Sequence, residues 1–277
     1  MTGQTRVNGQ PGAWLAVSDR GLSYGDGLFE TMRASGGEMV LWSRHMERLA
    51  LGCRRLKLPR PDPDFLAREC AAAVMGLGNA VVRLTLTRGC GPRGYAIPDA
   101  MRPALVVQAT VPPMLRRDWY HHGIRVHVCA TRLAAQPLLA GIKHLNRLEQ
   151  VLARSEWHDD SLAEGLVCDA DGQVIGATAA NLFAVLDGIL CTPELDACGV
   201  AGVARAELLA RHPDIVVRSI GIDELRGASE IFLTSSVRGI VPIAGIPAWQ
   251  LEFGVGPRTC ALQAEWQAAG FMPELPA

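Results

Sequence analysis

The stretch AGIKHLNRLEQVLARSEW, residues 140–157, places a lysine two residues after a glycine and just before a segment whose apolar side chains have helical spacing. We expect a helix over 144–157, with Lys143 at its mouth rather than on its solvated face. Most lysines are solvated surface charges. A lysine that is desolvated inside a folded site can instead lose its proton and act as an amine nucleophile, which is what a Schiff base with an aldehyde requires.

Size and composition indicate a globular protein of one large domain or two closely joined ones. The chain has 277 residues, of which 49% are apolar and 20% charged, so it can bury a sizeable core. Its formal net charge of −1 gives no overall field to attract nucleic acid or an anionic membrane, so we expect neither partner. The first residues lack the apolar core of a signal peptide, and no apolar run reaches the roughly 20 residues of a membrane span. We therefore expect a cytoplasmic protein.

The cysteines and histidines do not predict a metal site. Eight cysteines are scattered without a C-x-x-C pair, so in a reducing compartment we expect them to be small buried hydrophobic residues. His121, His122 and His127 gather in WYHHGIRVHV, a pattern typical of a loop that leads into a strand whose alternate residues face water. We predict no bound metal.

Apolar spacing and turn residues predict a mixed α+β fold. Besides 144–157, helical spacing is present over 43–58, 64–77, 203–212 and 257–269, and strand patterns cover 80–89, 104–111, 123–133, much of 164–193 and 216–220. DADG and LDG indicate tight hairpin turns within 164–193. There is no regular βαβ order and no internal repeat. We predict an N-terminal subdomain over 1–111, a linker over 112–118 and a C-terminal subdomain over 119–277.

A second feature of the sequence suits an anionic group. A glycine turn that ends at Gly202 leads into the helix expected from Val203, and backbone N–H groups at a helix start bind phosphate. Two hydroxyls, Ser235 and Ser236, stand at a strand end, and Arg48 in RHMERL could complete the set. Pyridoxal phosphate is the common cofactor that combines an aldehyde for a lysine with a phosphate. Taken singly, glycine turns before helices and serines at strand ends are mostly structural.

Order and spacing make these signals specific. The series resembles the fold-type IV pyridoxal-phosphate enzymes, the family of branched-chain and D-amino-acid aminotransferases and of 4-amino-4-deoxychorismate lyase. GIKHLNRLEQVL, with RGCGPRGY upstream, is most similar to the lyase. The resemblance covers nearly the whole chain and implies the two-subdomain fold of the D-amino-acid aminotransferase class, with the cofactor cleft between the subdomains. Its blocks are VSDRGLSYGDGLFETMR (17–33), LWSRHMERL (41–49), AGIKHLNRLEQVLARS (140–155), AANLFAVLDG (179–188), GVAGVAR (199–205) and EIFLTSSVRGIVPI (230–243).

The resemblance also implies roles for single residues. Lys143 would carry pyridoxal 5'-phosphate as a Schiff base and serve as the catalytic base, and Arg48 would hold the phosphate. The amides of Val203 and Ala204, with the Ser236 hydroxyl, would share that task. The family usually has a threonine where Ala204 stands, so one hydroxyl contact is expected to be missing.

Gly176 departs from the family pattern. The family normally has a glutamate at this position, shortly before the NLF triplet, whose carboxylate pairs with the pyridine nitrogen of the cofactor. Without that anion the pKa of the pyridinium should fall, and the ring should become a weaker electron sink. A transaminase must stabilise a full carbanion equivalent, whereas an aromatic lyase product supplies part of the driving force itself. We therefore hypothesise that Gly176 disfavours transamination more than lyase chemistry.

The expected function is the conversion of 4-amino-4-deoxychorismate to 4-aminobenzoate and pyruvate, a step towards folate, by a pyridoxal-phosphate-dependent carbon-oxygen lyase. Two alternatives stay open: a D- or branched-chain aminotransferase, and a catalytically impaired cofactor-binding homologue. The two substrate carboxylates call for arginines, and the candidates are Arg93, Arg147 and Arg238, with Tyr24 at the mouth of the cleft. The family builds each cleft near a subunit interface, so the resemblance implies a homodimer.

Overall fold

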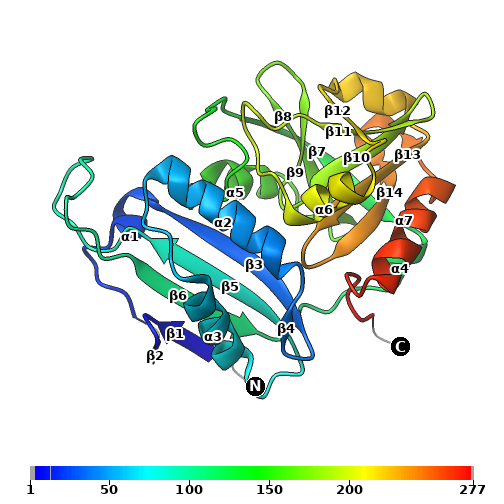
Figure 1. Ribbon diagram of the computed structural model, residues 1–277. Helices are drawn as coiled ribbons and strands as arrows, with labels where there is room; N and C mark the ends of the chain where they lie inside the picture. The colour runs from blue at the N-terminus through cyan, green and yellow to red at the C-terminus, as the bar shows by residue number, and fades with distance from the viewer. Residues whose placement is uncertain (1–3, 13, 276–277) are drawn as a thin grey trace. The chain divides into compact units, whose positions relative to one another are not determined.

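The computed structural model describes residues 4–12 and 14–275, which form two compact units (Figure 1). The first unit is the chain up to Pro113 together with a short return segment, Ile142–Asn146. The second unit is Met114–Gly141 together with the chain from Arg147 onward. The return segment carries Lys143, so this lysine belongs to the first unit, whereas the sequence-based division placed it in a subdomain over 119–277.

Within residues 4–12 and 14–113 and the return segment, the first unit is a six-stranded antiparallel sheet with two main helices on one face (Figure 1). Helix α2 packs on β3, and α3 packs on β1, β5 and β6. In sheet order the strands are β2 (Gln10–Pro11), β1 (Gln4–Val7), β6 (Ala104–Thr110), β5 (Asn79–Thr87), β3 (Gly27–Ser35) and β4 (Glu38–Met39), and the helices are α1 (Arg20–Tyr24), α2 (Trp42–Leu56) and α3 (Pro63–Val74).

Local sequence explains the boundaries of these elements. The Asp62 carboxylate accepts a hydrogen bond from the Asp64 N–H at 3.0 Å and caps α3, and Pro63 occupies its first turn, where no N–H is needed. Strand β5 alternates, so that Val82 and Leu84 are fully buried in the core. The helices predicted over 43–58 and 64–77 and the strands predicted over 80–89 and 104–111 are confirmed to within three residues.

The second unit is built on a mixed sheet, which in the described part of the chain has nine strands. Strand β7 pairs in parallel with β8 and β14, while most other neighbours are antiparallel. The strand order is β12 (Val216–Arg218), β11 (Ile189–Pro193), β10 (Asn181–Leu186), β13 (Glu230–Ser235), β14 (Gly239–Ile246), β7 (Ile124–Leu133), β8 (Leu162–Asp169) and β9 (Val174–Ala177), with β15 (Leu251–Glu252) paired to β14. The helices are α4 (Asp118–His121), α5 (Leu148–Arg154), α6 (Val203–Arg211) and α7 (Pro257–Ala268), with 3-10 turns η1 (Ile222–Gly227) and η2 (Pro247–Trp249).

Several predictions for this unit are confirmed. LDG forms the turn between β10 and β11, with φ of 51° at Asp187 and 79° at Gly188, the pair of positive angles that a type I′ hairpin needs. Helices α6 and α7 match the expected spans 203–212 and 257–269. Both units combine sheets and helices. Most strand pairs in the described residues are antiparallel, although α5 connects the parallel strands β7 and β8 and α6 connects the parallel strands β11 and β12, so the mixed α+β class is confirmed. No helix among the described residues is long and apolar enough to cross a membrane.

The helix expected over 144–157 is shorter than predicted. Helix α5 begins at Leu148, and the residues between it and Lys143 have no helical structure. They pair instead with β3: the Phe29 N–H donates to the Lys143 carbonyl at 2.9 Å, and the Leu145 N–H donates to the Gly27 carbonyl at 3.0 Å. These backbone bonds compete successfully with helix formation, so Lys143 lies beside a strand and not at a helix mouth.

Candidate active site

Lys143 lies against an aromatic ring of the first unit. Its backbone faces Phe29 across the bridge to β3, and its Nζ is 4.4 Å from the centroid of the Phe29 ring. The Arg83 guanidinium carbon is 4.2 Å from the same centroid. An aromatic face attracts a cation and excludes water from it. Lys143 is half-buried, and its side chain contacts this ring, unlike a freely solvated surface lysine.

The next residue of β3, Glu30, is a buried acid that holds Arg48. Arg48 donates from Nε to Glu30 Oε1 at 2.9 Å and from Nη2 to Oε2. His45, one helical turn before Arg48 on α2, has its Nδ1 2.6 Å from the same Oε2. Burial alone would raise the pKa of Glu30, but the charge of Arg48 and the hydrogen bonds from His45 and Arg48 lower it to about 2. The acid is therefore ionised at neutral pH.

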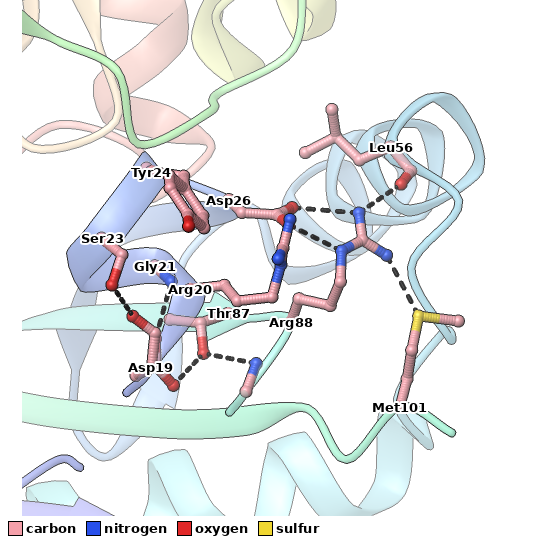
Figure 2. Close-up of polar contacts among 12 residues, drawn as sticks. Asp19, Arg20, Gly21, Ser23, Tyr24, Asp26, Leu56, Thr87, Arg88 and Met101 are labelled. Atoms are coloured by element: carbon pink, nitrogen blue, oxygen red, sulfur yellow. Dashed lines mark hydrogen bonds and ion pairs between the residues drawn. The ribbon is translucent and has the colours of Figure 1, made fainter. Parts of the chain in front are cut away.

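Figure 2 shows a second polar cluster, at the start of β3. Asp26 accepts hydrogen bonds from Arg20 Nε at 3.0 Å and from Arg88 Nε and Nη2 at 2.7 and 2.9 Å. Asp19 caps α1 by accepting from the Gly21 N–H at 2.7 Å, and it also accepts from the Thr87 hydroxyl at 2.7 Å. Both arginines are almost fully buried. This cluster fixes the turn SYGDG between α1 and β3.

Tyr24 and Arg93 are linked through the glycine-rich loop RGCGPRGY (88–95). The Tyr24 hydroxyl accepts a hydrogen bond from the Gly94 N–H at 3.0 Å, and its ring lies 5.5 Å from the ring of Tyr95. Arg20 donates from Nη1 to the Gly94 carbonyl at 2.9 Å. Arg93 precedes Gly94 in this loop and its side chain is exposed. The Tyr24 side chain thus holds the loop that presents Arg93 to solvent.

In the second unit, the start of α6 is prepared to accept an anion. The Asn181 side chain accepts a hydrogen bond from the Gly202 N–H at 2.9 Å and donates one to the Val200 carbonyl at 2.9 Å, which fixes the turn that enters the helix. Val203 and Ala204 open α6 and are buried. The N–H groups in the first turn of a helix have no intrahelical partner, and the helix dipole is positive there. The backbone amides of Val203 and Ala204 can therefore donate hydrogen bonds to a phosphate.

Ser236 and Arg238 follow the end of β13. The Ser235 hydroxyl accepts a hydrogen bond from the Arg238 N–H at 3.1 Å. The Arg238 guanidinium donates from Nη2 to the buried carboxylate of Glu164 at 2.5 Å, and the Thr178 hydroxyl donates to the same carboxylate. A substrate carboxylate at Arg238 would have to compete with this acid. Ser236 stands directly after the strand and is half-buried.

Gly176 has a backbone conformation that L side chains rarely adopt. Its φ is +152°, and a Cβ at this position would lie 2.8 Å from the Ala180 carbonyl oxygen, closer than real Cβ atoms come. The residue also pairs with Val167 across β8 and β9. Any side chain at position 176, including the glutamate that the sequence resemblance leads one to expect there, therefore requires the backbone to shift.

Arg147 immediately precedes α5 and is half-buried. Burial lowers the pKa of its guanidinium to about 10, against the opposing charge of Glu149. At neutral pH it remains a cation, which keeps it suited to a carboxylate partner.

His127, Cys129 and Glu156 are grouped as metal ligands would be, with their ligand atoms within 4.8 Å of one another in the described part of the chain. Glu156, however, already accepts the N–H groups of Ala130 at 2.6 Å and Thr131 at 2.8 Å, where the register of β7 against β8 shifts. Burial raises the pKa of the Cys129 thiol to about 12, which disfavours the thiolate that a metal needs. A carboxylate that satisfies a β-bulge accounts for this cluster.

The residues singled out from the sequence fall in both units. Lys143 and Arg48 contact two adjacent residues of one strand, Phe29 and Glu30 of β3. Sequence reasoning missed Glu30 and His45, although a glutamate inside the apolar strand GLFETM is a signal, since a buried acid needs a partner. The first unit holds Lys143, Arg48, Tyr24 and Arg93, and the second holds Val203, Ala204, Ser236, Gly176, Arg147 and Arg238.

The chain belongs to the amino-transferase class IV family, whose model matches residues 27–246. This confirms the resemblance found in the sequence blocks. Aminodeoxychorismate lyase of Vibrio harveyi is 34% identical over 263 residues, covering 93% of this chain and 97% of that protein. The crystal structure of 4-amino-4-deoxychorismate lyase from Pseudomonas aeruginosa superposes with a TM-score of 0.91 at 45% identity, covering 95% of this chain and 98% of that one. A putative branched-chain-amino-acid aminotransferase of Methanocaldococcus jannaschii is 31% identical over 83% of this chain and 82% of its own.

Proposed function

We propose that this chain is a pyridoxal-phosphate-dependent lyase that converts 4-amino-4-deoxychorismate to 4-aminobenzoate and pyruvate. The observation that carries the proposal is the position of Lys143, which is bonded to β3 through its backbone and lies over the Phe29 ring, within the motif GIKHLNRLEQVL. The two lyase relatives, at 34% and 45% identity over more than nine-tenths of the chain, support the same reaction.

The chemistry of the described residues fits pyridoxal phosphate in most respects. When bound, the cofactor supplies an aldehyde that joins covalently to an amine and a ring that withdraws electrons. Lys143 offers the amine. Arg48 offers a guanidinium for the phosphate, and the start of α6 at Val203 and Ala204, with the Ser236 hydroxyl, offers neutral donors. Ala204 lacks the hydroxyl that the family usually has there, and Gly176 offers no acid.

We assign the proton transfer to Lys143. Its Nζ, as a free amine, takes the proton from C4 of the substrate as general base. The Phe29 ring beside Nζ keeps water from one side of the amine. The bond between the adjacent ring carbon and the enolpyruvyl oxygen then breaks, and Lys143 or a water returns the proton to the departing enolpyruvate, which becomes pyruvate. The six-membered ring of the product becomes aromatic, which provides much of the driving force.

Two of the three candidate arginines are the better choices for the substrate carboxylates. Arg238 is engaged by the buried Glu164 carboxylate, so a substrate would have to displace an ion pair to reach it. Arg147 is half-buried and charged, and Arg93 is exposed in the glycine-rich loop that Tyr24 holds. We therefore assign carboxylate recognition to Arg147 and Arg93, with Tyr24 as the support of the loop.

An aminotransferase is the rival of the same family, and the relative from Methanocaldococcus jannaschii is the reason to consider it. Gly176 argues against it, because transamination needs the strongest electron sink and the φ of +152° keeps an acid from this position. An aminotransferase would exchange its cofactor between aldehyde and amine forms with a keto acid and an amino donor. A catalytically impaired homologue would bind the cofactor and turn over no amine.

We further propose that the chain acts as a homodimer. Apolar side chains are exposed in each unit, which a protein surface usually avoids in groups. In the second unit, Leu148, Val151 and Leu152 form an exposed apolar stripe on α5 at helical spacing. In the first unit, Trp14 and Val17 are at least four-fifths exposed. Sedimentation velocity of the purified chain tests this: a species of one chain mass at micromolar concentration contradicts it.

The test of the function has two stages. The purified protein is mixed with pyridoxal phosphate, its visible spectrum recorded, and the mixture reduced with borohydride and mapped by peptide mass. We expect one modified peptide that contains Lys143, and then formation of fluorescent 4-aminobenzoate from 4-amino-4-deoxychorismate. Lys143→Ala is expected to abolish both. Label spread over surface lysines contradicts the Schiff-base role, and a keto-acid-dependent cofactor exchange without 4-aminobenzoate favours the aminotransferase.

A further inference from the structure

The first unit contains an ionic cluster of Glu30, His45 and Arg48, in which the proposed function gives a role to Arg48 but none to its two buried partners. Glu30 is 1% exposed and His45 is fully buried. The Nε and Nη2 groups, which form one edge of the Arg48 guanidinium, both bond to the Glu30 carboxylate. A two-point contact of this kind fixes the plane and the direction of a guanidinium, which a single bond does not.

Glu30 places Arg48 relative to Lys143 through one strand. Phe29 and Glu30 are neighbours on β3. The Phe29 N–H bonds to the Lys143 carbonyl and its ring contacts the Lys143 side chain, whereas the Glu30 carboxylate bonds to Arg48. The strand is held on its other side by β5 in full register from Gly27 to Ser35. The distance between the Lys143 amine and the Arg48 guanidinium is therefore set by Phe29 and Glu30, two adjacent residues of a strand held in a sheet. Without Glu30, the flexible side chain of Arg48 would set it.

His45 holds the acid in turn. A carboxylate only accepts, so the 2.6 Å contact between His45 Nδ1 and Glu30 Oε2 requires the proton on Nδ1. Burial lowers the pKa of His45 against the raising effect of Glu30, which favours the neutral ring. Within the described residues, Nε2 of His45 has no hydrogen-bond partner. The buried imidazole of His45 bonds to Glu30 through Nδ1 and leaves Nε2 without a bond. Its orientation is therefore explained by the contact with Glu30.

We propose that Glu30 is a positioning residue that sets the Arg48 guanidinium for the cofactor phosphate, and that His45 holds Glu30 in place. The inference rests on the proposed function, in which Arg48 binds that phosphate. Glu30 would then contribute to the phosphate-dependent part of cofactor affinity through Arg48, the side chain to which its carboxylate is bonded.

Charge alone predicts the opposite effect, which makes the inference testable by its sign. Glu30 is an anion beside Arg48, so its removal leaves more positive charge for a phosphate and, on electrostatic grounds, strengthens binding. If Glu30 acts by positioning, its removal frees the guanidinium and weakens binding. Glu30→Gln keeps the side-chain shape and removes the charge, so it separates the two effects.

The experiment compares the dissociation constants of pyridoxal phosphate and of pyridoxal, which lacks the phosphate, for the apoprotein by absorbance titration at one pH. We expect Glu30→Gln to weaken pyridoxal phosphate about tenfold or more and to change pyridoxal less than about twofold. His45→Asn should act in the same direction to a smaller extent. Glu30→Asp keeps the charge but shortens the side chain, so that the carboxylate no longer reaches Arg48 in the same way, and it should also lower the preference for pyridoxal phosphate. This variant replaces Glu30→Gln if Glu30→Gln does not fold.

Glu69→Gln is the matched control. Glu69 is a buried acid of the same unit that holds Arg6 by the same edge, with Nε at 2.8 Å and Nη2 at 3.2 Å. Its loss should lower stability and leave the ratio of the two affinities unchanged. A wild-type protein that does not prefer pyridoxal phosphate to pyridoxal overturns the proposed function. A wild-type preference that persists or grows in Glu30→Gln and Glu30→Asp overturns only the positioning role.

Discussion

The glycine at position 176 combines a positive φ with a crowded Cβ direction. The angle of +152° and the 2.8 Å approach to the Ala180 carbonyl both oppose a side chain. The family glutamate can therefore be restored here only if the turn between β9 and β10 changes its course. The sequence shows only that position 176 lacks an acidic residue. The structure adds that the backbone there has a φ that disfavours any side chain, which residue identities alone do not reveal.

Substitution at this glycine should cost stability without a gain in rate. We expect Gly176→Ala to lower the free energy of unfolding by about 2 kcal/mol, because the new Cβ is both strained and crowded. Gly176→Glu should lose at least as much and should not form 4-aminobenzoate faster. Urea unfolding and the lyase assay measure the two effects. Gly172→Ala is the control, since its φ is +78° but its Cβ would meet open space. A stable Gly176→Glu enzyme that is faster by orders of magnitude would show that the electron sink limits the rate.

Glu30 also predicts a pH dependence of stability. Its pKa is about 2 in the folded protein against an ordinary 4.5, so the unfolded state takes up its proton first as the pH falls. The stabilisation by the ionised acid is complete above about pH 4.5 and is lost between that value and about pH 2, with a size on the order of 3 kcal/mol. The difference in unfolding free energy between wild type and Glu30→Gln should shrink over this range. A difference that stays constant from pH 5 to pH 2 contradicts the assignment.

At the scale of elements, the local sequence pattern predicted helices and turns correctly where residues within the element itself stabilise its ends. Helix α3 has a cap and a proline at its start, and the LDG turn has the residues that its angles demand. The helix expected from residue 144 failed at its first turn because Lys143 and Leu145 bond to β3. Glu30 was missed for a related reason: its partners, His45 and Arg48, are on another element. Partners from distant segments leave no periodic signal.

The turn into α6 depends on one side chain from β10. Asn181 satisfies the Gly202 N–H and the Val200 carbonyl together. Asn181→Ala should lower stability by about 2 kcal/mol, since two backbone groups lose their partner, and should weaken pyridoxal phosphate more than pyridoxal. Asn181→Asp keeps an acceptor for Gly202 but sets an anionic oxygen against the Val200 carbonyl, so it should not restore the loss. Thermal unfolding with and without each ligand measures both. If Asn181→Ala loses stability but keeps its full phosphate preference, the turn is only structural.

At the scale of the whole chain, the family and the α+β class were predictable because the motifs are spread over nearly all of the sequence. The return of 142–146 to the first unit was not, since it depends on pairing with a strand far earlier in the chain. The cysteines also show that composition does not predict the burial of each single residue. Composition predicted buried thiols, which is confirmed for six of them and wrong for Cys90 and Cys260, which are exposed.

Thiol reactivity should therefore divide the eight cysteines into two classes. Cys90 lies in the glycine-rich loop and Cys260 on α7, and both are open to reagent. The other six are buried, and burial raises the thiol pKa to about 12 at Cys70 and about 11 at Cys53, so the reactive thiolate is rare at pH 8.

With Ellman's reagent at pH 8 we expect two thiols per native chain to react in a fast phase and all eight to react in urea. The double variant Cys90→Ser/Cys260→Ser should lose the fast phase entirely while keeping the native fold. A third fast thiol would mean that part of the fold opens on the timescale of the reagent. Peptide mapping of the label would show whether it is in the first unit, which holds Cys53 and Cys70, or in the second, which holds the other four buried cysteines.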